Sequence, residues 1–251
     1  MSFTITEECS LPSGGLIYGK PVNPNFKIRS MTTEEEMRRL AHTERPYKLL
    51  CDIIEECIVG EKPGISVYDM CFGDYQYLLQ KLRIATYGPE YRIMGYCPHC
   101  GAENADTIDL GSMELRTLSE DKFEDGLIVD LPVTGKRVEM RLQTPRSLDD
   151  IALKRKDILA KNPLMDSDPT ILYTLKSLVY KIDGETPEQV RLDNMIRQLP
   201  MRDSNKILNA AKKLNDTIGY NMRLHLSCKE CGLDYNSTFR ITSEFFGPSE
   251  D

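Results

Sequence analysis

Apolar residues recur every three or four positions along several segments of the chain, and this period predicts amphipathic helices. The clearest apolar face comprises Tyr47, Leu50, Cys51, Ile54, Cys57 and Ile58. The pattern predicts helices over residues 33–41, 46–58, 74–87, 148–161, 170–182, 188–198 and 204–215, and a short helical turn over 67–72. Thr33 and Glu36 form a capping box at the first helix. Ser147, followed by Asp150, resembles another at the start of the fourth.

Other segments alternate apolar and polar residues with a period of two, which is typical of half-buried strands. The alternation predicts strands over residues 26–29, 91–96, 107–110, 127–131, 137–142, 222–226 and 235–241. The segment from Pro132 to Gly135 lies between two of these strands and indicates a hairpin. No internal repeat and no low-complexity tract interrupts this order.

The composition is that of a folded protein with little affinity for phosphate backbones. The chain has 251 residues, of which 40% are hydrophobic and 28% are charged, and this length permits one large domain or two small ones. Lys and Arg number 32 against 39 Asp and Glu, so the net charge is −7, whereas nucleic-acid binding depends on cationic side chains. No apolar run approaches the roughly 18 residues of a membrane helix. Residues 1–10 also carry no secretory signal, so we expect a soluble cytosolic protein with reduced thiols.

The 8 cysteines divide into two groups by their surroundings. One CxxC unit is formed by Cys97 and Cys100 and a second by Cys228 and Cys231. A glycine follows each unit, and predicted strands flank it. Two such units supply four thiolates, which is the tetrahedral ligand set that Zn²⁺ prefers, so the sequence predicts a zinc ribbon that holds one Zn²⁺. The other cysteines are interpreted as small core residues: Cys9, Cys51, Cys57 and Cys71.

Alternatives to a single zinc site are a redox motif, two unrelated CxxC turns, and a ligand set that includes histidine. A redox CxxC unit begins a helix within a strand–helix–strand unit, and neither unit here has that context. His99 and His225 are possible replacement ligands, but four thiolates already complete the coordination shell. We therefore expect His99 to face water.

The two CxxC units are separated by residues 101–227, so the metal would join distant parts of the chain. Closing so long a loop costs on the order of several kcal/mol in chain entropy. Structural zinc contributes about 10–16 kcal/mol in small peptides, which can offset that cost. Because all four ligands come from the protein, no position is left for water or substrate, and the predicted site is structural.

These elements predict an α+β protein that is mainly helical, with a small antiparallel β part and a zinc ribbon built from two distant CxxC knuckles. We expect four regions along the chain. They are an extended N-terminal arm (1–30), an N-terminal helical region (31–90), a zinc ribbon with β-hairpins (91–146 and 220–251) and an inserted helical bundle (147–219).

No catalytic motif is present in the sequence. It contains no phosphate-binding loop, no dinucleotide fingerprint, no HExxH and no GxSxG. Paired acids such as Asp149 and Asp150 lie in first helical turns, where they favour the helix dipole. We therefore expect a non-enzyme without a small-molecule substrate. Around the CxxC units, acids balance the basic residues and no cationic stripe appears, which argues against nucleic-acid binding.

Two terminal segments carry apolar residues that belong to no predicted element. Leu16, Ile17 and Tyr18 stand among glycines and prolines near the N-terminus, and Phe245 and Phe246 stand near the C-terminus. Such a segment either packs across its own domain or extends over a neighbouring protein. Buried apolar and aromatic anchors supply most of the energy of protein interfaces, so all five residues are candidate partner-binding residues.

Several motifs together resemble a known family. They are LPSGGLIYG at 11–19, Ile28-Arg29, DYQYLL at 74–79, Leu82-Arg83-Ile84, Tyr87-Gly88, CPHCG at 97–101, Ile108-Asp109-Leu110, CKECG at 228–232 and Phe245-Phe246. With these motifs the chain resembles the baseplate-hub proteins of contractile-tailed bacteriophages of the T-even type. The resemblance spans nearly the whole chain and is strongest over 11–110.

The resemblance implies a structural component of the phage tail baseplate, in its hub region, that binds other tail and baseplate proteins. It implies a location in the virion after assembly in the host cytoplasm, and the family is not known for enzymes. One alternative within the family is a transient hub-assembly factor or chaperone that is absent from the virion. A second alternative, outside the family, is a zinc-ribbon regulator that binds nucleic acid.

Overall fold

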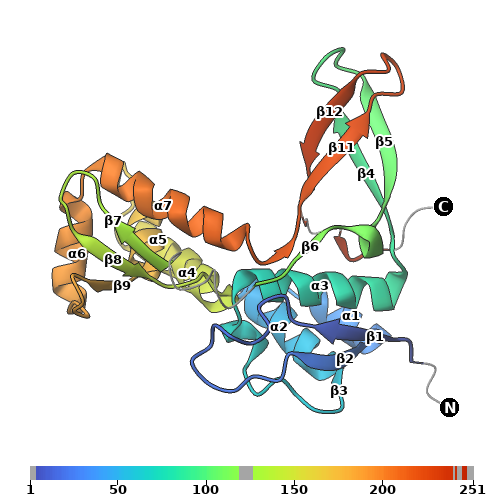
Figure 1. Ribbon diagram of the computed structural model, residues 1–251, viewed down its shortest axis with the longest axis horizontal. Coiled ribbons are helices and arrows are strands. Elements are labelled where there is room, and N and C mark those ends of the chain that lie inside the picture. The colour runs from blue at the N-terminus through green and yellow to red at the C-terminus, as the bar shows by residue number, and fades with distance from the viewer. Residues whose placement is uncertain (1–3, 119–126, 240, 242–244, 248–251) are drawn as a thin grey trace.

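A computed structural model describes residues 4–118, 127–239, 241 and 245–247, and these form three parts (Figure 1). The N-terminal body contains the first three helices and the first three strands. A ribbon of two β-hairpins projects from the body, and a helical lobe lies on the other side of it (Figure 1). Among the described residues, helices account for 41% and strands for 22%. The α+β class is therefore confirmed, although "mainly helical" overstates the helical share.

The predicted helices form with shifted ends. They are α1 (Thr33–Arg39), α2 (Pro46–Cys57), α3 (Phe72–Tyr87), α4 (Pro145–Lys161), α5 (Thr170–Leu178), α6 (Gln189–Gln198) and α7 (Met201–Asn215), with short 3₁₀ helices at Val67–Asp69 and Leu110–Ser112. The capping boxes differ from the expected ones. That of α1 is Thr32 with Glu35 rather than Thr33 with Glu36. That of α4 is Thr144 with Ser147, three residues before the expected one, because Pro145 occupies the first helical turn. The predicted helix 170–182 ends at Leu178, where the β-branched Val179 begins a strand.

The strands form five small antiparallel sheets within the described ranges. They are β1 (Thr6–Ser10), β2 (Asn25–Arg29), β3 (Ile58–Val59), β4 (Glu90–Tyr96), β5 (Glu103–Asp109), β6 (Leu115–Arg116), β7 (Ile128–Asp130), β8 (Arg137–Met140), β9 (Val179–Ile182), β10 (Gly219–Tyr220), β11 (Arg223–Ser227) and β12 (Asp234–Thr238). The predicted strand 235–241 ends at 238 in β12, and its residue 240 lies outside the described residues.

The segment expected to be an extended arm is part of the body. β1 pairs with β2 from Thr6↔Arg29 to Ser10↔Asn25, and β2 pairs with β3. Sequence inspection missed β1 because its residues are mostly polar and only Cys9 is buried. The turn between β1 and β2 lies on α3, where the buried Asp74 holds it. Asp74 accepts hydrogen bonds from the backbone N–H and the hydroxyl of Ser13, at 2.9 and 2.5 Å.

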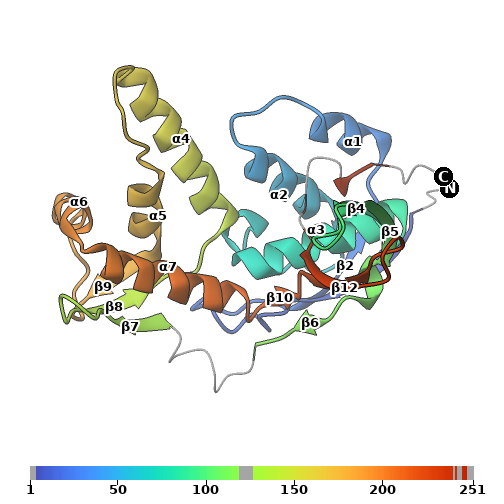
Figure 2. The same ribbon diagram turned by 90° about the horizontal axis from the view of Figure 1, so that it is seen from above.

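The body has the largest apolar core of the described residues, formed mainly by α2, α3 and the β1–β2–β3 sheet. The four cysteines interpreted as core residues (Cys9, Cys51, Cys57 and Cys71) are all buried, which confirms that prediction. Asp149 of α4 joins the lobe to this body, because its carboxylate accepts the backbone N–H groups of Tyr47 and Lys48 at the start of α2. It also accepts the hydroxyl of Tyr68 at 3.0 Å. Figure 2 shows α4 extending away from the body.

The helical lobe has its own apolar core, which includes a β-sheet. The β7–β8 hairpin and β9 form one antiparallel sheet, and its buried Val138 and Met140 pack with α5, α6 and α7. The hairpin that we assigned to the ribbon region 91–146 therefore forms but belongs to the lobe. Its buried apolar residues pack with α5, α6 and α7 in the core of the lobe.

A close backbone crossing joins the lobe to the body. After α7 the chain forms β10, which pairs with β6 through Gly219↔Arg116 and Tyr220↔Leu115. At this point Ile218 passes directly over Gly73 in the first turn of α3. A Cβ atom on Gly73 would lie 2.4 Å from the carbonyl oxygen of Ile218. Glycine is therefore required at position 73 for the chain to return from the lobe.

Candidate metal centre

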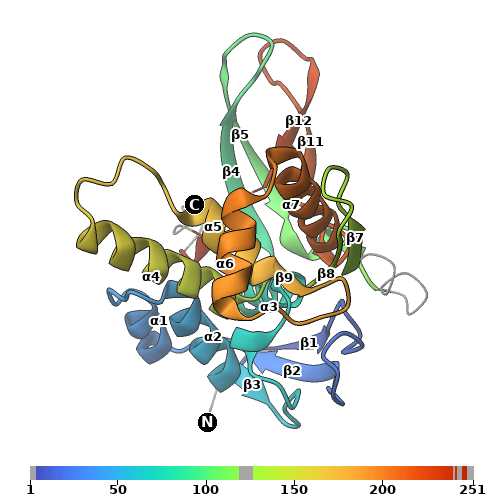
Figure 3. The ribbon, with the colours of Figure 1, turned by 90° about the vertical axis from the view of Figure 1, so that its left-hand side faces the viewer.

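Two β-hairpins bring the CxxC units together at the far end of the ribbon. β4 pairs with β5 from Glu90↔Asp109 to Tyr96↔Glu103, so the connecting turn carries Cys97 and Cys100. β11 pairs with β12 from Arg223↔Thr238 to Ser227↔Asp234, so its turn carries Cys228 and Cys231. The two hairpins stand side by side with both turns at the tip (Figures 1 and 3).

Both turns have the same backbone geometry, which the sequence dictates locally. The N–H of Gly101 donates to the carbonyl of Cys97, and the N–H of Gly232 donates to that of Cys228, each at 2.9 Å. The two glycines have φ values of 75° and 71°, a left-handed conformation that residues with a Cβ atom rarely adopt. Each turn therefore directs both of its sulfur atoms toward the other hairpin.

The four sulfur atoms form a cluster with the dimensions of a tetrahedral zinc site. All four lie within 4.8 Å of one another. The Sγ atoms of Cys97 and Cys231 are 3.8 Å apart, and those of Cys100 and Cys228 are 3.7 Å apart. A zinc–sulfur bond of about 2.3 Å places tetrahedral sulfur atoms about 3.8 Å apart. The four residues therefore fit one zinc ion. The separations also exceed the length of a disulfide bond, about 2 Å, so the thiols are free.

The cluster is buried on one side and exposed on the other. Cys97 and Cys228 are each 2% exposed and pack with Tyr235, whereas Cys100 and Cys231 are exposed. Backbone donors reach the sulfur atoms, as the N–H of His99 does to Cys97 Sγ at 3.4 Å. Hydrogen bonds from the backbone N–H of Cys231 and from the Asn104 amide lower the pKa of the Cys228 thiol to about 6. These donors favour the thiolate, which is the form in which cysteine binds metal.

Sequence reasoning missed Asn104, which contacts the cluster from β5. Its Nδ2 lies 3.4 Å from Cys228 Sγ, and its Oδ1 accepts the backbone N–H of Lys229 at 2.9 Å. The side chain is only 3% exposed. A polar residue at an inward position of a strand, four residues after a CxxC unit, is the signal that could have found it.

The histidines are not positioned as ligands. The ring of His99 is exposed and its Nε2 lies 3.2 Å from the carbonyl oxygen of Asp234. His225 is exposed on β11. The positions of both histidines agree with a cluster formed by four cysteines alone.

The five candidate partner-binding residues have different surroundings. Phe245 and Phe246 are 0% and 6% exposed and lie in the core of the body. The hydroxyl of Tyr18 donates to Asp74 Oδ2 at 2.5 Å. Ile17 is half-buried, and Leu16 is 47% exposed. Of the five, only Leu16 is exposed, and about half of its surface faces solvent.

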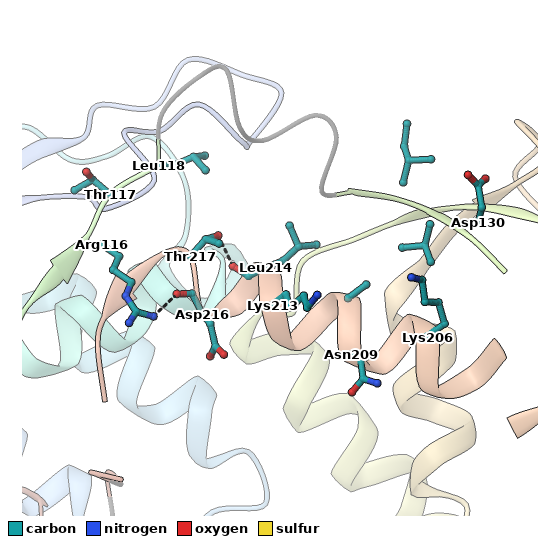
Figure 4. Close-up of a pocket in the computed structure, with 13 residues that line it drawn as sticks. Arg116, Thr117, Leu118, Asp130, Lys206, Asn209, Lys213, Leu214, Asp216 and Thr217 are labelled. Carbon is teal, nitrogen blue, oxygen red and sulfur yellow. Dashed lines mark hydrogen bonds between the residues drawn. The ribbon is translucent and has the colours of Figure 1, made fainter. Parts of the chain in front are cut away.

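Among the described residues, a cavity of about 820 Å³ lies between α7 and the segments around β6 and β7 (Figure 4). Its polar lining includes Lys206, Lys213 and Asp130, and the guanidinium of Arg116 donates to the backbone oxygen of Asp216 at 2.8 Å. The lining contains neither histidine nor cysteine.

The fold and the site define an α+β protein with a cluster of four cysteines that could hold a metal ion. None of the helices in the described ranges has the length and apolar character needed to cross a bilayer. The family described as T4 bacteriophage base plate protein matches residues 3–247, and the chain belongs to this family. No curated protein and no solved structure matches it.

Proposed function

We propose that this baseplate protein is a structural component of the hub region of the phage tail, which acts through protein–protein contacts rather than as an enzyme. The observation that carries the proposal is the family match over residues 3–247, which includes the body, the ribbon and the lobe. A closed metal centre fits this role, because four cysteine ligands leave no coordination position for a substrate.

The proposed metal is a single structural Zn²⁺ held by Cys97, Cys100, Cys228 and Cys231. The 3.7 and 3.8 Å sulfur separations support it. The ion would fasten the two hairpins of the ribbon to each other, because their turns face each other across the cluster. The role of the ion is therefore structural: it stabilises a projecting ribbon that can contact neighbouring proteins.

The proposed contact surface of the body is the turn between β1 and β2. Asp74 holds this turn through Ser13 and Tyr18, so that Leu16 is presented in a fixed position. A pre-ordered apolar side chain loses little conformational entropy when it binds. Phe245 and Phe246 support the same body from inside its core, where Arg83 donates to the carbonyl oxygen of Phe245 at 2.9 Å.

Mass spectrometry of purified, mature phage tails tests the proposal. A hub component is present in a fixed ratio to the other baseplate proteins and cross-links to its neighbours there. A hub-assembly factor would instead be abundant in infected cells and missing from the tails, which would establish that alternative. Activity of the purified protein on nucleic acid or peptide substrates would contradict a purely structural role.

A gel shift in physiological salt tests the nucleic-acid alternative. The ribbon gives it little support, since Lys229 at the tip already pairs with Asp106 at 3.1 Å. Sub-micromolar binding that weakens steeply as salt rises would establish a nucleic-acid regulator and overturn the tail assignment.

A further inference from the structure

Asn104 connects the two halves of the metal cluster through its side chain. It lies on β5 in the first hairpin, yet two of its three hydrogen bonds reach the second hairpin. Its Nδ2 donates to Cys228 Sγ at 3.4 Å and to the carbonyl of Ala102 at 3.2 Å, while its Oδ1 accepts the N–H of Lys229 at 2.9 Å. The amide is buried, and all these partners belong to the two CxxC turns.

We propose that Asn104 is a positioning residue of the metal centre, which fixes Cys228 as a ligand and determines how tightly the ion is held. The inference rests on the proposed zinc function of the same site. Asn104 acts on the ion through Cys228 and through the backbone of the second turn. It does not coordinate the ion itself.

Two physical effects support this role. An N–H group that donates to a thiolate draws charge from the sulfur atom and restricts its direction, as partners of metal ligands commonly do. The bond to the N–H of Lys229 fixes the residue that follows Cys228, and therefore the direction of the Cys228 side chain. Both effects are in place before the ion binds, because they use only protein atoms. Loss of such a partner typically weakens metal binding by about 10–100-fold.

A neighbouring contact reinforces the same connection. The ammonium group of Lys229 donates to the carbonyl oxygen of Ala105 and pairs with the carboxylate of Asp106. Residues 104, 105 and 106 of β5 thus all contact the second turn, but only the Asn104 side chain among these three reaches a cluster sulfur.

Cobalt titration of the purified full chain tests the inference. Co²⁺ in a four-thiolate site gives absorption bands whose energies report the charge on the sulfur atoms. In Asn104→Ala we expect at least a tenfold rise in the Co²⁺ and Zn²⁺ dissociation constants and a shift of the sulfur-to-cobalt band to longer wavelength. Asn236→Ala is the matched control, because Asn236 is an exposed asparagine on β12 of the same ribbon. This control should leave the dissociation constants and the position of the sulfur-to-cobalt band unchanged.

A second variant separates the sulfur contact from general packing. Asn104→Asp keeps the shape and the acceptor for Lys229 but replaces the donor to Cys228 with a carboxylate oxygen. We expect it to weaken binding and shift the band as Asn104→Ala does. A folded Asn104→Asp with wild-type affinity and spectrum would overturn the proposal, as would failure of both variants to fold in the presence of zinc. Absence of cobalt and zinc binding by the wild type would instead remove the proposed metal function itself.

Discussion

The hydroxyl of Tyr18 lies 2.5 Å from the carboxylate oxygen Oδ2 of Asp74, and it also accepts the backbone N–H of Cys71 at 3.1 Å. One phenol therefore connects the β1–β2 turn to the start of α3. The carboxylate is fully buried, and this burial raises its pKa even though Ser13 and Tyr18 donate to it. Each donor to Asp74 consequently matters for the stability of the body.

Tyr18→Phe should destabilise the protein by about 1.5–3 kcal/mol. The change removes one donor from a buried carboxylate and leaves the N–H of Cys71 without its acceptor. Urea unfolding measures the effect. Tyr96→Phe is the matched control, since Tyr96 is 72% exposed, and it should change the free energy of unfolding by less than about 0.5 kcal/mol. Equal effects of the two changes would contradict the role assigned to Tyr18.

Gly73→Ala should destabilise the fold by about 1–3 kcal/mol or more, because the new Cβ would lie 2.4 Å from the carbonyl oxygen of Ile218. Backbone on both sides has to move to relieve the overlap. Gly95→Ala in β4 serves as the control, since no atom lies within 4 Å of its added Cβ. A thermal melt of Gly73→Ala that coincides with that of Gly95→Ala would show that the crossing is loosely packed.

Glu35 should make stability depend on pH in the acid range. The guanidinium of Arg29 lowers the pKa of the Glu35 carboxyl to about 2. Because the folded-state pKa lies below the unfolded value of about 4.3, the stabilisation is complete above that value and is lost as the pH falls toward 2. The difference in unfolding free energy between wild type and Glu35→Gln should be largest at neutral pH and shrink below about pH 4.5.

Comparing the two proteins at each pH removes the contribution of the metal centre, which both share. Denaturant unfolding between pH 7 and pH 3 provides the measurement. A difference that stays constant over this range would mean that the ion pair of Glu35 with Arg29 contributes nothing to stability.

Cys228→Ser should destabilise the ribbon by loss of metal. We expect less than one zinc per chain by elemental analysis and a melting temperature about 6–12 °C lower, which corresponds to a loss of roughly 3 kcal/mol at about 2–4 °C per kcal/mol. A strong chelator should lower the melting temperature of the wild type to that of the variant and have no further effect on the variant. A folded, reduced wild-type sample without zinc would contradict the assignment of the metal.

Leu16→Asp should leave the purified protein folded and prevent tail assembly. Leu16 is 47% exposed in a turn that is held by other residues, so its loss removes a contact surface without opening the core. Leu164→Asp, at a 98% exposed position of the lobe, controls for the general effect of a new surface carboxylate. Complementation of a phage that lacks the protein gives the readout. Normal assembly with Leu16→Asp would show that the turn is not an interface.

The clustering of the four cysteines was predictable from sequence because two CxxC units with following glycines specify the turn geometry locally. The helices were predictable for a similar reason, since the apolar period of α2 is uninterrupted from Tyr47 to Cys57. β1 was missed because its pairing depends on β2 rather than on its own alternation. The hairpin of β7 and β8 was predicted correctly but assigned to the ribbon, because alternation does not specify which core a strand packs against.

The buried polar contacts were beyond prediction for a different reason. Asp149 caps α2 from a position 101 residues further along the chain than Lys48, and Asn104 contacts Cys228 across 124 positions. The local sequence does not specify which distant segment each of these side chains contacts, although the strand pattern marks position 104 as inward-facing. Only the three-dimensional arrangement gives each of them its partner.

The separation of the two CxxC turns also imposes an order on biosynthesis. Cys228 follows Cys100 by 128 positions, so a ribosome that adds about 5–20 residues per second makes the second pair of ligands on the order of ten seconds after the first. Until then the nascent chain offers only two thiolates, which cannot complete a tetrahedral shell. The proposed Zn²⁺ site is therefore complete only after the whole helical lobe has been translated. A chain that is truncated within the lobe would lack two of the four cysteines, so on the proposed function zinc content would distinguish completed chains from truncated ones.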